Sequence, residues 1–395
     1  MRIYLDHNAG APLRPEAAAA IETLLREHDG NPSSVHRAGQ RARRRLEHAR
    51  SQVAALIGAS PREIVFTSGG TESNNLAIEG ATRAAGAGRR VVTSAIEHSS
   101  ILAPLRELEN RGFTIERVRP DADGRIDPRA VLSAIGGDAA LVTLGHANAE
   151  IGTIQSLAPI AEAASQAGAL FHVDAAQSAG RIPVDVRQLR CDLLTISGHK
   201  LGAPAGIGAL YVRERARLAP VTLGGPHESG LRAGTPNLLG AVAFGAAAEA
   251  VHQSLEIESR RCAELAGLLL ERLSAAIPGL RLNGPDSGRI ANTLNLAFPE
   301  VRGESMLIAL DLAGVEVSMG SACAAGSVEA SHVLLAVGRS ETEALSSLRI
   351  SLGWSTTREE IDAASEIIAS VWRRVAESET APEPQRSLAQ PEALR

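Results

Sequence analysis

Lys200 is the only lysine in this chain of 395 residues, and it ends the stretch Ser197-Gly198-His199-Lys200. Every other strongly basic side chain is an arginine, whose guanidinium stays protonated and cannot act as an amine nucleophile, whereas a desolvated lysine can. The same composition would result if one lysine had been retained by chance. The position of Lys200 favours a chemical role. The apolar run at residues 193–196 predicts a buried strand just before it, and open α/β sheets place their ligands at the carboxyl ends of strands.

A second stretch, Ser68-Gly69-Gly70-Thr71, follows a predicted strand at residues 64–67 and precedes a predicted helix. It supplies backbone N–H groups, hydroxyls and a helix amino terminus, which together suit a phosphate. A Gly-Gly turn before a helix often serves only the turn, so the stretch is a weak signal by itself. The chain has neither a GxGxxG nor a Walker pattern, which argues against dinucleotides and nucleoside triphosphates.

Asp174 follows the apolar stretch Phe171-His172-Val173 and so places a carboxylate at the end of another predicted strand. A helix cap would account for it equally well. Beside a phosphate pocket and the single lysine, however, it becomes a candidate partner for a protonated pyridine nitrogen. A Schiff-base lysine, an aspartate and a phosphate cradle are what pyridoxal 5'-phosphate needs from a protein.

These residues depend on a sheet to bring them together. Between residues 63 and 213, apolar runs that predict strands alternate with helical patterns, at residues 64–67, 90–93, 140–144, 170–173, 193–196 and 208–212. The alternation predicts an α/β fold with a mostly parallel sheet covered by helices on both faces. Polar residues that follow the strands should then collect along one edge of the sheet, at residues 69–71, 97–98, 146–148, 174–177 and 197–200.

A second, smaller α/β unit is predicted after a long helix at residues 238–276, with strands at residues 293–297, 315–318 and 349–352. A capping-box pattern at Thr357-Arg358-Glu359-Glu360 predicts the start of the last helix. We expect a large domain at residues 11–255. Residues 1–10 and 256–376 should form the small domain, and residues 377–395 a disordered tail.

An arginine-rich helix is predicted near the amino terminus, capped by Ser33 or Ser34 and with Val35 at the start of its apolar face. Its arginines at positions 41, 43, 44, 45 and 50 fall mostly outside that face. We interpret them as the solvated side of an amphipathic helix. A patch that binds nucleic acid is the less favoured interpretation.

Composition excludes several classes of protein. The formal net charge of −5 gives no electrostatic reason to expect nucleic acid as a partner. No apolar run approaches the roughly 20 residues that span a bilayer, and the amino terminus lacks the apolar segment of a signal peptide, so we expect no membrane association and a cytoplasmic location. Three widely separated cysteines indicate neither a disulfide framework nor a metal site.

Taken together, the motifs resemble those of the cysteine desulfurases, in the branch of the class V aminotransferase family used for iron–sulfur cluster and nitrogenase assembly. The resemblance extends to about residue 375 and is specific through the combination and order of its motifs. They lie at residues 4–9, 30–34, 66–75, 97–98, 172–177, 197–200, 232–235, 320–323 and 349–353. It implies a pyridoxal-phosphate-dependent transferase of fold type I that acts as a homodimer.

The resemblance also implies roles for the residues that match. Lys200 would hold the cofactor as a Schiff base and later remove the proton from the substrate's Cα. Asp174 would keep the pyridine nitrogen protonated, which strengthens the ring as an electron sink. His98 would stack on the ring and assist proton transfer, and Gln177 would hydrogen-bond its phenolic oxygen.

Further residues are expected around the phosphate and the substrate. The phosphate would be held by Gly70, Thr71, Ser197 and His199, with Thr235 contributed by the other subunit of the dimer. Arg349 would bind the carboxylate of L-cysteine through paired hydrogen bonds, with Asn148 nearby.

Cys323 is expected to be the sulfur carrier. We interpret Cys191 and Cys262 as small buried apolar residues, whereas Cys323 lies in the small-residue stretch 319–326, which suits a mobile loop. A loop thiolate could attack the sulfur of the bound cysteine and pass the persulfide to a sulfur-acceptor or iron–sulfur scaffold protein.

The chain departs from the family pattern at three places. Ala149 stands where a second asparagine is usual, Gly10 and Ala11 replace a threonine pair, and Met319 replaces a small hydroxyl residue. These departures leave two alternatives open. One is another enzyme of the same fold, such as a selenocysteine lyase or an aminotransferase, and the other is a weakly catalytic cofactor-binding scaffold for sulfur acceptors.

Overall fold

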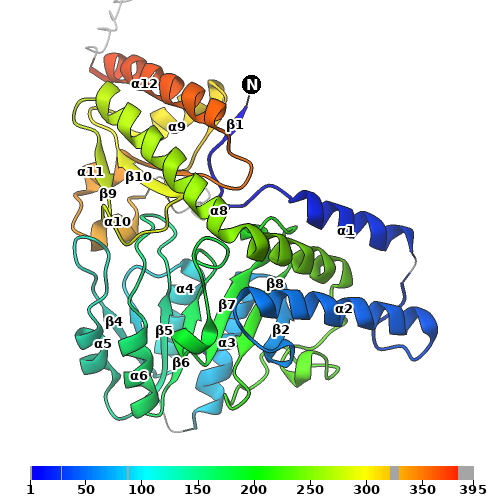
Figure 1. The fold of residues 1–395 in the computed structure, drawn as a ribbon. Coiled ribbons are helices and arrows are strands. Elements are labelled where there is room, and N and C mark those ends of the chain that lie inside the picture. The colour runs from blue at the N-terminus through cyan, green and yellow to red at the C-terminus, as the bar shows by residue number, and fades with distance from the viewer. Residues whose placement is uncertain (1, 28, 87–88, 321–328, 381–395) are drawn as a thin grey trace, which may run out of the picture.

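A seven-stranded sheet forms the centre of the larger part of the molecule (Figure 1). The computed structural model describes residues 2–27, 29–86, 89–320 and 329–380. In spatial order the strands are β2 (Ile64–Thr67), β8 (Gly208–Val212), β7 (Leu193–Ser197), β6 (Leu170–Asp174), β5 (Ala139–Gly145), β3 (Arg90–Ser94) and β4 (Thr114–Val118). Only β8 runs antiparallel to its neighbours, so the predicted mostly parallel sheet is confirmed.

Alternating side chains of the strands enter two different cores, one on each face of the sheet. Val65, Leu141 and Leu193 join the core formed with helices α3 (Gly70–Ala84) and α4 (Ser99–Asn110). Their neighbours Phe66, Val142 and Leu194 join the opposite core. Among the helices that contribute to that second core are α2 (Arg37–Leu56), α5 (Pro128–Ile135), α6 (Ala158–Gln166) and the first half of α8 (Leu238–Ala276). Both faces are therefore buried, as the short apolar strands predict.

The smaller part contains an antiparallel sheet in the order β12 (Ser347–Ser351), β10 (Thr293–Ala297) and β9 (Arg281–Asn283). The amino-terminal β1 (Ile3–Tyr4) pairs in parallel with β11 (Val315–Glu316), which ties the start of the chain to this part. Helices α9 (Gly303–Leu312), α12 (Arg358–Thr380) and the second half of α8 cover its core. The first ten residues thus reach the smaller part before the chain enters the larger one.

Helix α8 runs through both parts of the molecule (Figure 1). Among the described residues it is the one helix long and apolar enough to cross a membrane by length and composition. Phe244 and Val251 are buried in the core of the larger part, and Leu269 in that of the smaller part. A core helix that joins two hydrophobic clusters accounts for this apolar character.

Two short helices, α10 (His332–Ala336) and α11 (Glu341–Leu345), return from the smaller part to the larger one. Their Val333, Leu334 and Ala344 belong to the core beneath the large sheet. The chain therefore lies in the core of the smaller part before residues 321–328 and in that of the larger part after them. The domain limits themselves stay a prediction.

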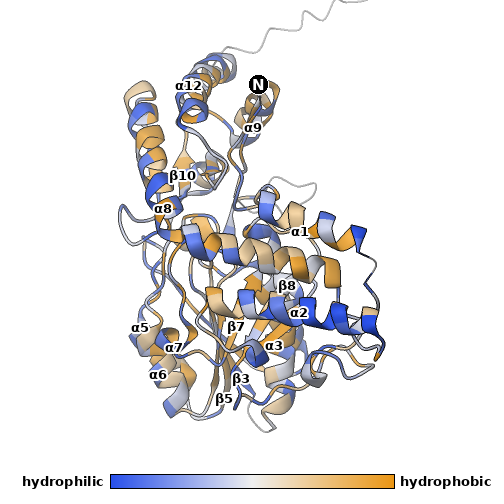
Figure 2. Cartoon of the chain, turned by 45° about the vertical axis from the view of Figure 1, so that its right-hand side comes forward, coloured by the Kyte–Doolittle hydropathy of each residue, from blue (hydrophilic) through white to orange (hydrophobic). Residues whose placement is uncertain are grey.

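The amino-terminal helix differs from its prediction in two respects. Helix α2 is capped by His36, whose side chain accepts a hydrogen bond from the backbone N–H of Gly39, and Val35 lies outside it with an exposed side chain. Figure 2 shows a largely hydrophilic α2. Arg50, however, is buried and paired with Glu228 at 2.7 Å, so it is not part of a solvated face.

The last helix begins as predicted, because Thr357 and Glu360 exchange the two hydrogen bonds of a capping box. It continues through residue 380, so residues 377–380 are helical and not part of a disordered tail. The rest of the predicted tail lies outside the described residues. The remaining helical elements are α1 (Pro15–Arg26), α7 (Val186–Leu189), η1 (Pro61–Glu63), η2 (Gly198–Lys200) and η3 (Glu228–Gly230).

Candidate active site

A cavity of about 320 Å³ lies at the carboxyl ends of β5, β6 and β7, the edge at which the polar residues were expected to meet. The predicted site residues that line it are Gly70, Thr71, His98, Asn148, Asp174, Gln177, Ser197, His199, Lys200 and Arg349. Thr235 is exposed and does not line this cavity, so its expected contribution to a second subunit stays a prediction. Cys323 lies outside the described residues.

Lys200 is the last residue of the short helix η2, directly after β7. Its Nζ donates to the backbone carbonyls of Asn8 and Ala9 at 2.5 and 2.8 Å. The amino-terminal segment therefore passes over the floor of the cavity and holds the amine at its wall. Strand β7, which directly precedes this helix, is wholly buried and so fixes the point from which Lys200 is presented.

Asp174 ends β6 and is buried, with 9% of its surface exposed. One carboxylate oxygen accepts from Asn74 Nδ2 at 2.8 Å, and the other accepts from the backbone N–H of Ala176 at 2.9 Å. These two hydrogen bonds fix the orientation of the carboxylate at the end of the strand. Asp174 is therefore suited to face a cationic group in the cavity.

A small cradle lies where helix α3 begins. A Cβ atom added at Gly70 would meet Ser197 Cβ at 3.4 Å and fill this space, so glycine keeps it open. Ser197 Oγ is hydrogen-bonded to His199 Nδ1 at 2.9 Å. Burial and the nearby Lys200 lower the pKa of His199 to about 4, so its ring is neutral. Backbone N–H groups, hydroxyls and a helix amino terminus fit a phosphate.

His98 caps helix α4 with its own ring. Its Nδ1 accepts from the backbone N–H of Ser100 at 3.1 Å and lies 2.7 Å from Ser100 Oγ. Burial lowers the pKa of His98. Asp174 opposes that shift, while Lys200 and His332 add to it. The ring is thus held at the cavity wall in an environment that disfavours its positive charge.

Gln177 is held from both ends of its amide. Nε2 donates to the backbone carbonyl of Asn8 at 3.0 Å, and Oε1 accepts from Arg181 at 2.7 Å. Burial lowers the pKa of Arg181 to about 10, which leaves the guanidinium charged at neutral pH. The orientation of the Gln177 amide is therefore set by protein groups.

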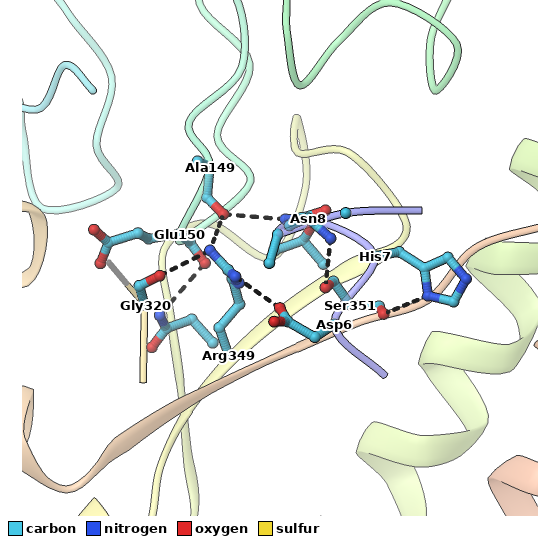
Figure 3. Close-up of polar contacts among 12 residues, drawn as sticks. Asp6, His7, Asn8, Ala149, Glu150, Gly320, Arg349 and Ser351 are labelled. Carbon is cyan, nitrogen blue, oxygen red and sulfur yellow. Dashed lines mark hydrogen bonds and ion pairs between the residues drawn. The ribbon is translucent and has the colours of Figure 1, made fainter. Parts of the chain in front are cut away.

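Arg349 forms the opposite rim of the cavity, on β12 of the smaller part (Figure 3). Its guanidinium donates to Asp6 Oδ1 at 2.7 Å, to the carbonyl of Gly320 at 2.9 Å and to that of Ala149 at 3.4 Å. Its Nε is buried without a hydrogen-bond partner among the described residues. Within the described part of the chain, Arg349 therefore carries one unsatisfied N–H, while its other contacts fix the guanidinium at the rim.

Glu150 connects both sides of residues 321–328. Its carboxylate accepts from Ser331 Oγ at 2.5 Å, and a Cβ added at Gly320 would come within 2.7 Å of the same carboxylate oxygen. Burial raises the pKa of Glu150, while the hydrogen bond from Ser331 and the charges of His332 and Arg349 act against that shift. Gly320 and Ser331 are thus both held against one buried acid.

Glu97 is a second buried acid, beneath the cavity. It accepts from Ser94 Oγ at 2.6 Å and from the backbone N–H of Gly145 at 2.8 Å. Burial raises its pKa to about 7, and the hydrogen bond from Ser94 opposes that shift. Its backbone carbonyl lies 3.0 Å from His332 Nε2, which joins α10 to the cavity wall.

Several residues of the site were not singled out from the sequence. Asn74 lies within the motif at residues 66–75, one turn along α3 from Gly70, and this spacing could have placed it beside the cradle. Ser100 follows His98 by two residues, the spacing of a helix cap. Asn8 lies within the motif at residues 4–9, but Glu150 and His332 gave no comparable signal, because both reach the cavity through long-range packing.

The fold and the cavity agree with the comparisons to known proteins. A family model described as aminotransferase class-V matches residues 3–364, so the chain belongs to the class V aminotransferase family. Members of this family depend on pyridoxal 5'-phosphate. The Gly70 cradle and the doubly hydrogen-bonded Asp174 fit such a group.

Within that family the chain falls among the cysteine desulfurases of the NifS/IscS-like branch. It is 42% identical over 370 residues to a cysteine desulfurase IscS of Dictyoglomus turgidum, which covers 93% of this chain and 94% of that protein. A solved NifS-like protein has a TM-score of 0.89 at 32% identity and covers 95% and 100% of the two chains. A structure titled SspA in complex with cysteine has a TM-score of 0.79 at 35% identity, covering 89% and 99%.

Proposed function

We propose that this protein converts L-cysteine to L-alanine with pyridoxal 5'-phosphate and leaves the sulfur as a persulfide on Cys323. The observation that carries the proposal is the single cavity that gathers Lys200, Asp174, the Gly70 cradle and Arg349. The cysteine complex of the similar SspA structure supports the choice of substrate.

Residues on the sheet side of the cavity would hold the cofactor. Lys200 would bind it covalently, Asp174 would face its ring nitrogen, and His98 would stack on the ring. Gly70, Thr71, Ser197 and His199 would bind the phosphate, and Gln177 would approach the phenolic oxygen. When bound, the cofactor supplies an electron sink for charge that develops at the substrate's Cα.

The rim would hold the substrate. Arg349 lines the same cavity as Lys200 and brings a guanidinium to its rim, which suits a carboxylate. Asn148 donates to the carbonyl of Ile96 and accepts from the backbone N–H of Glu150, so its side chain is fixed at the wall. With the carboxylate at Arg349, Lys200 serves as the base for the Cα proton.

Sulfur transfer balances without an added oxidant or reductant. The Cys323 thiolate forms an S–S bond to the substrate's sulfur while the substrate's Cβ–S bond breaks. Protons returned to Cβ and Cα complete L-alanine, and the enzyme keeps the sulfur atom. The thiolate of a sulfur-acceptor or iron–sulfur scaffold protein then attacks the outer sulfur of the persulfide, the S–S bond to Cys323 breaks, and the Cys323 thiolate is released.

The assembly and location of the protein are also part of the proposal. Thr235 is exposed on its own chain, and Leu223 nearby in the same segment is 78% exposed, which supports burial of this segment in a homodimer. The formal net charge of −5 argues against nucleic acid as a partner. We propose a cytoplasmic location, in keeping with the reduced thiol that the reaction needs.

Alanine and sulfide release from L-cysteine test the proposal. We expect turnover by the cofactor-loaded parent and by a control, Cys191→Ala, because Cys191 is buried and burial raises the pKa of its thiol to about 12. Lys200→Ala and Cys323→Ala should form no alanine above background. Turnover that survives loss of Cys323 would reject the persulfide step and favour a selenocysteine lyase or an aminotransferase. A loaded but inactive parent would favour the scaffold.

A further inference from the structure

Four side chains form a hydrogen-bonded chain along the cavity wall, from Asp174 through Asn74 and Ser100 to His98. Asn74 Nδ2 lies 2.8 Å from Asp174 Oδ2 and 2.8 Å from Ser100 Oγ. Ser100 Oγ lies in turn 2.7 Å from His98 Nδ1. Asn74 is on α3 and Ser100 on α4, two helices that contact each other on the same face of the sheet.

The hydrogens of this chain can point in only one direction. Asp174 is charged and can only accept, so the amide of Asn74 must turn its NH₂ group towards it. The same NH₂ group then donates its second hydrogen to Ser100 Oγ. His98 Nδ1 already accepts from the backbone N–H of Ser100 and so carries no proton of its own, which leaves the Ser100 hydroxyl as the donor in its contact with Nδ1.

His98 Nδ1 therefore accepts twice, from the Ser100 hydroxyl and from the Ser100 backbone N–H at 3.1 Å. A ring nitrogen that accepts two hydrogen bonds carries no proton, so the proton of the neutral ring is on Nε2. A positive ring is disfavoured further by the amino terminus of α4 and by Lys200 and His332, while Asp174 acts in the opposite direction. No hydrogen bond from the described residues reaches Nε2.

We propose that Asn74 and Ser100 are positioning residues that hold His98 neutral with its proton on Nε2, so that His98 is a hydrogen-bond donor to the reacting molecule and not a base. A neutral ring with Nδ1 blocked has no site to accept a proton. The chain behind it runs through the amide of Asn74, which cannot relay a proton from Asp174 to Nδ1. Proton removal then falls to Lys200 alone, and this assignment rests on the proposed function.

Nitrogen spectra of the enzyme labelled with ¹⁵N-histidine test the tautomer directly, with the His98 signals assigned by their loss in His98→Gln. We expect the Nε2–H form in the parent. Ser100→Ala removes one of the two bonds to Nδ1, so the ring should protonate at a pH higher by about half a unit. Ser100→Thr should restore the parent titration, and Asn74→Ala should shift it in the same direction as Ser100→Ala.

Ser99→Ala is the matched control, because it removes a hydroxyl one residue away without touching the chain. An Nδ1–H signal in the parent, or a His98 titration in Ser100→Ala equal to that in Ser99→Ala, would overturn the proposal. These spectra report on the ring whether or not the protein turns over cysteine.

Kinetics separate a donor from a base. Glutamine keeps an N–H donor at position 98, whereas leucine of similar size has none, so kcat of His98→Gln should exceed that of His98→Leu about tenfold or more. If His98 were the base, both variants would be equally poor, because neither can take a proton. A parent that forms no alanine would refute the proposed function. The spectra would still decide the tautomer of His98.

Discussion

The floor and the rim of the cavity are built in different ways. The floor consists of Asp174, Ser197 and Lys200 at the ends of adjacent strands of one sheet. The rim is assembled by contacts between distant segments, such as Arg349 with Asp6 and Asn8 with the carbonyl of Ala149 (Figure 3). The floor follows from strand order, whereas the rim exists only once the smaller part has closed on the larger one.

Arg349→Lys should have the largest effect of the rim changes. A lysine cannot donate to Asp6, to the Gly320 carbonyl and to a substrate carboxylate together, because it lacks the planar fork of N–H groups. We expect kcat/KM for L-cysteine to fall about 100-fold, mainly through KM, equivalent to about 3 kcal/mol. Steady-state kinetics of alanine formation provide the measurement.

Arg272→Lys serves as its control, since Arg272 forms a half-exposed ion pair with Asp362 on the surface. Its kinetics should match those of the parent. If Arg349→Lys changed kcat and left KM unaltered, the rim would not be the carboxylate site.

The pH dependence of stability, compared between the parent and Glu97→Gln, tests the floor of the cavity. Because burial raises the pKa of Glu97 to about 7, its ionised form is unfavourable in the folded state. The free-energy cost of ionising Glu97 in the folded state is absent below its unfolded-state pKa near 4.5. It is complete above pH 7, where it lowers the free energy of unfolding by about 3 kcal/mol. The parent should therefore lose stability relative to Glu97→Gln as pH rises from about 5 to about 8.

Urea unfolding of both proteins across this pH range measures the difference in the free energy of unfolding. A constant difference would show that Glu97 does not change its charge on folding in this way.

Much of the floor could be predicted from the sequence, and the reason is local. A strand followed by Asp174 or by Ser197-Gly198-His199-Lys200 needs only the parallel order of the sheet to bring the side chains together. The partners that orient them could not be predicted. Asn74, for example, reaches Asp174 across 100 residues because α3 packs over β6 and β7.

The difference between local patterns and long-range contacts also explains two features outside the site that the sequence did not predict. Strand β4 is partly exposed at the sheet edge and carries Glu116 and Arg117, so it lacks the apolar run that marks the inner strands. Arg50 belongs by spacing to a solvated face, yet it is buried by Glu228, 178 residues away. Periodicity predicts which face of an element is apolar, but long-range pairing decides which charged residues are buried as well.

Gly320→Ala tests whether the rim depends on Glu150. Gly320 has a φ of +101°, and an added Cβ would come within 2.7 Å of the Glu150 carboxylate, which is held by Ser331. We expect a loss of about 2 kcal/mol in stability, from backbone strain and displacement of the buried acid.

Gly338→Ala separates these two causes. Gly338 has a similar φ of +85° but open space around the position of its Cβ. The loss of stability in Gly338→Ala, measured by urea unfolding, should be about half of that in Gly320→Ala. Equal losses for the two variants would mean that contact with Glu150 has no energetic consequence.

Ala149→Asn should have the smallest effect. The side chain of Ala149 lines the cavity, while its carbonyl is already held by Asn8 at 3.0 Å. An amide added there supplies one hydrogen bond towards the substrate, so we expect kcat/KM to rise about fivefold, or about 1 kcal/mol. Unchanged turnover and cysteine affinity would show that the missing amide does not limit substrate orientation.

The mass of the enzyme after brief exposure to L-cysteine measures persulfide formation on Cys323. We expect the peptide that carries Cys323 to gain one sulfur atom, a reductant to remove it, and Lys200→Ala to show no gain. Release of alanine from the parent without any gain of sulfur on that peptide would contradict the persulfide step.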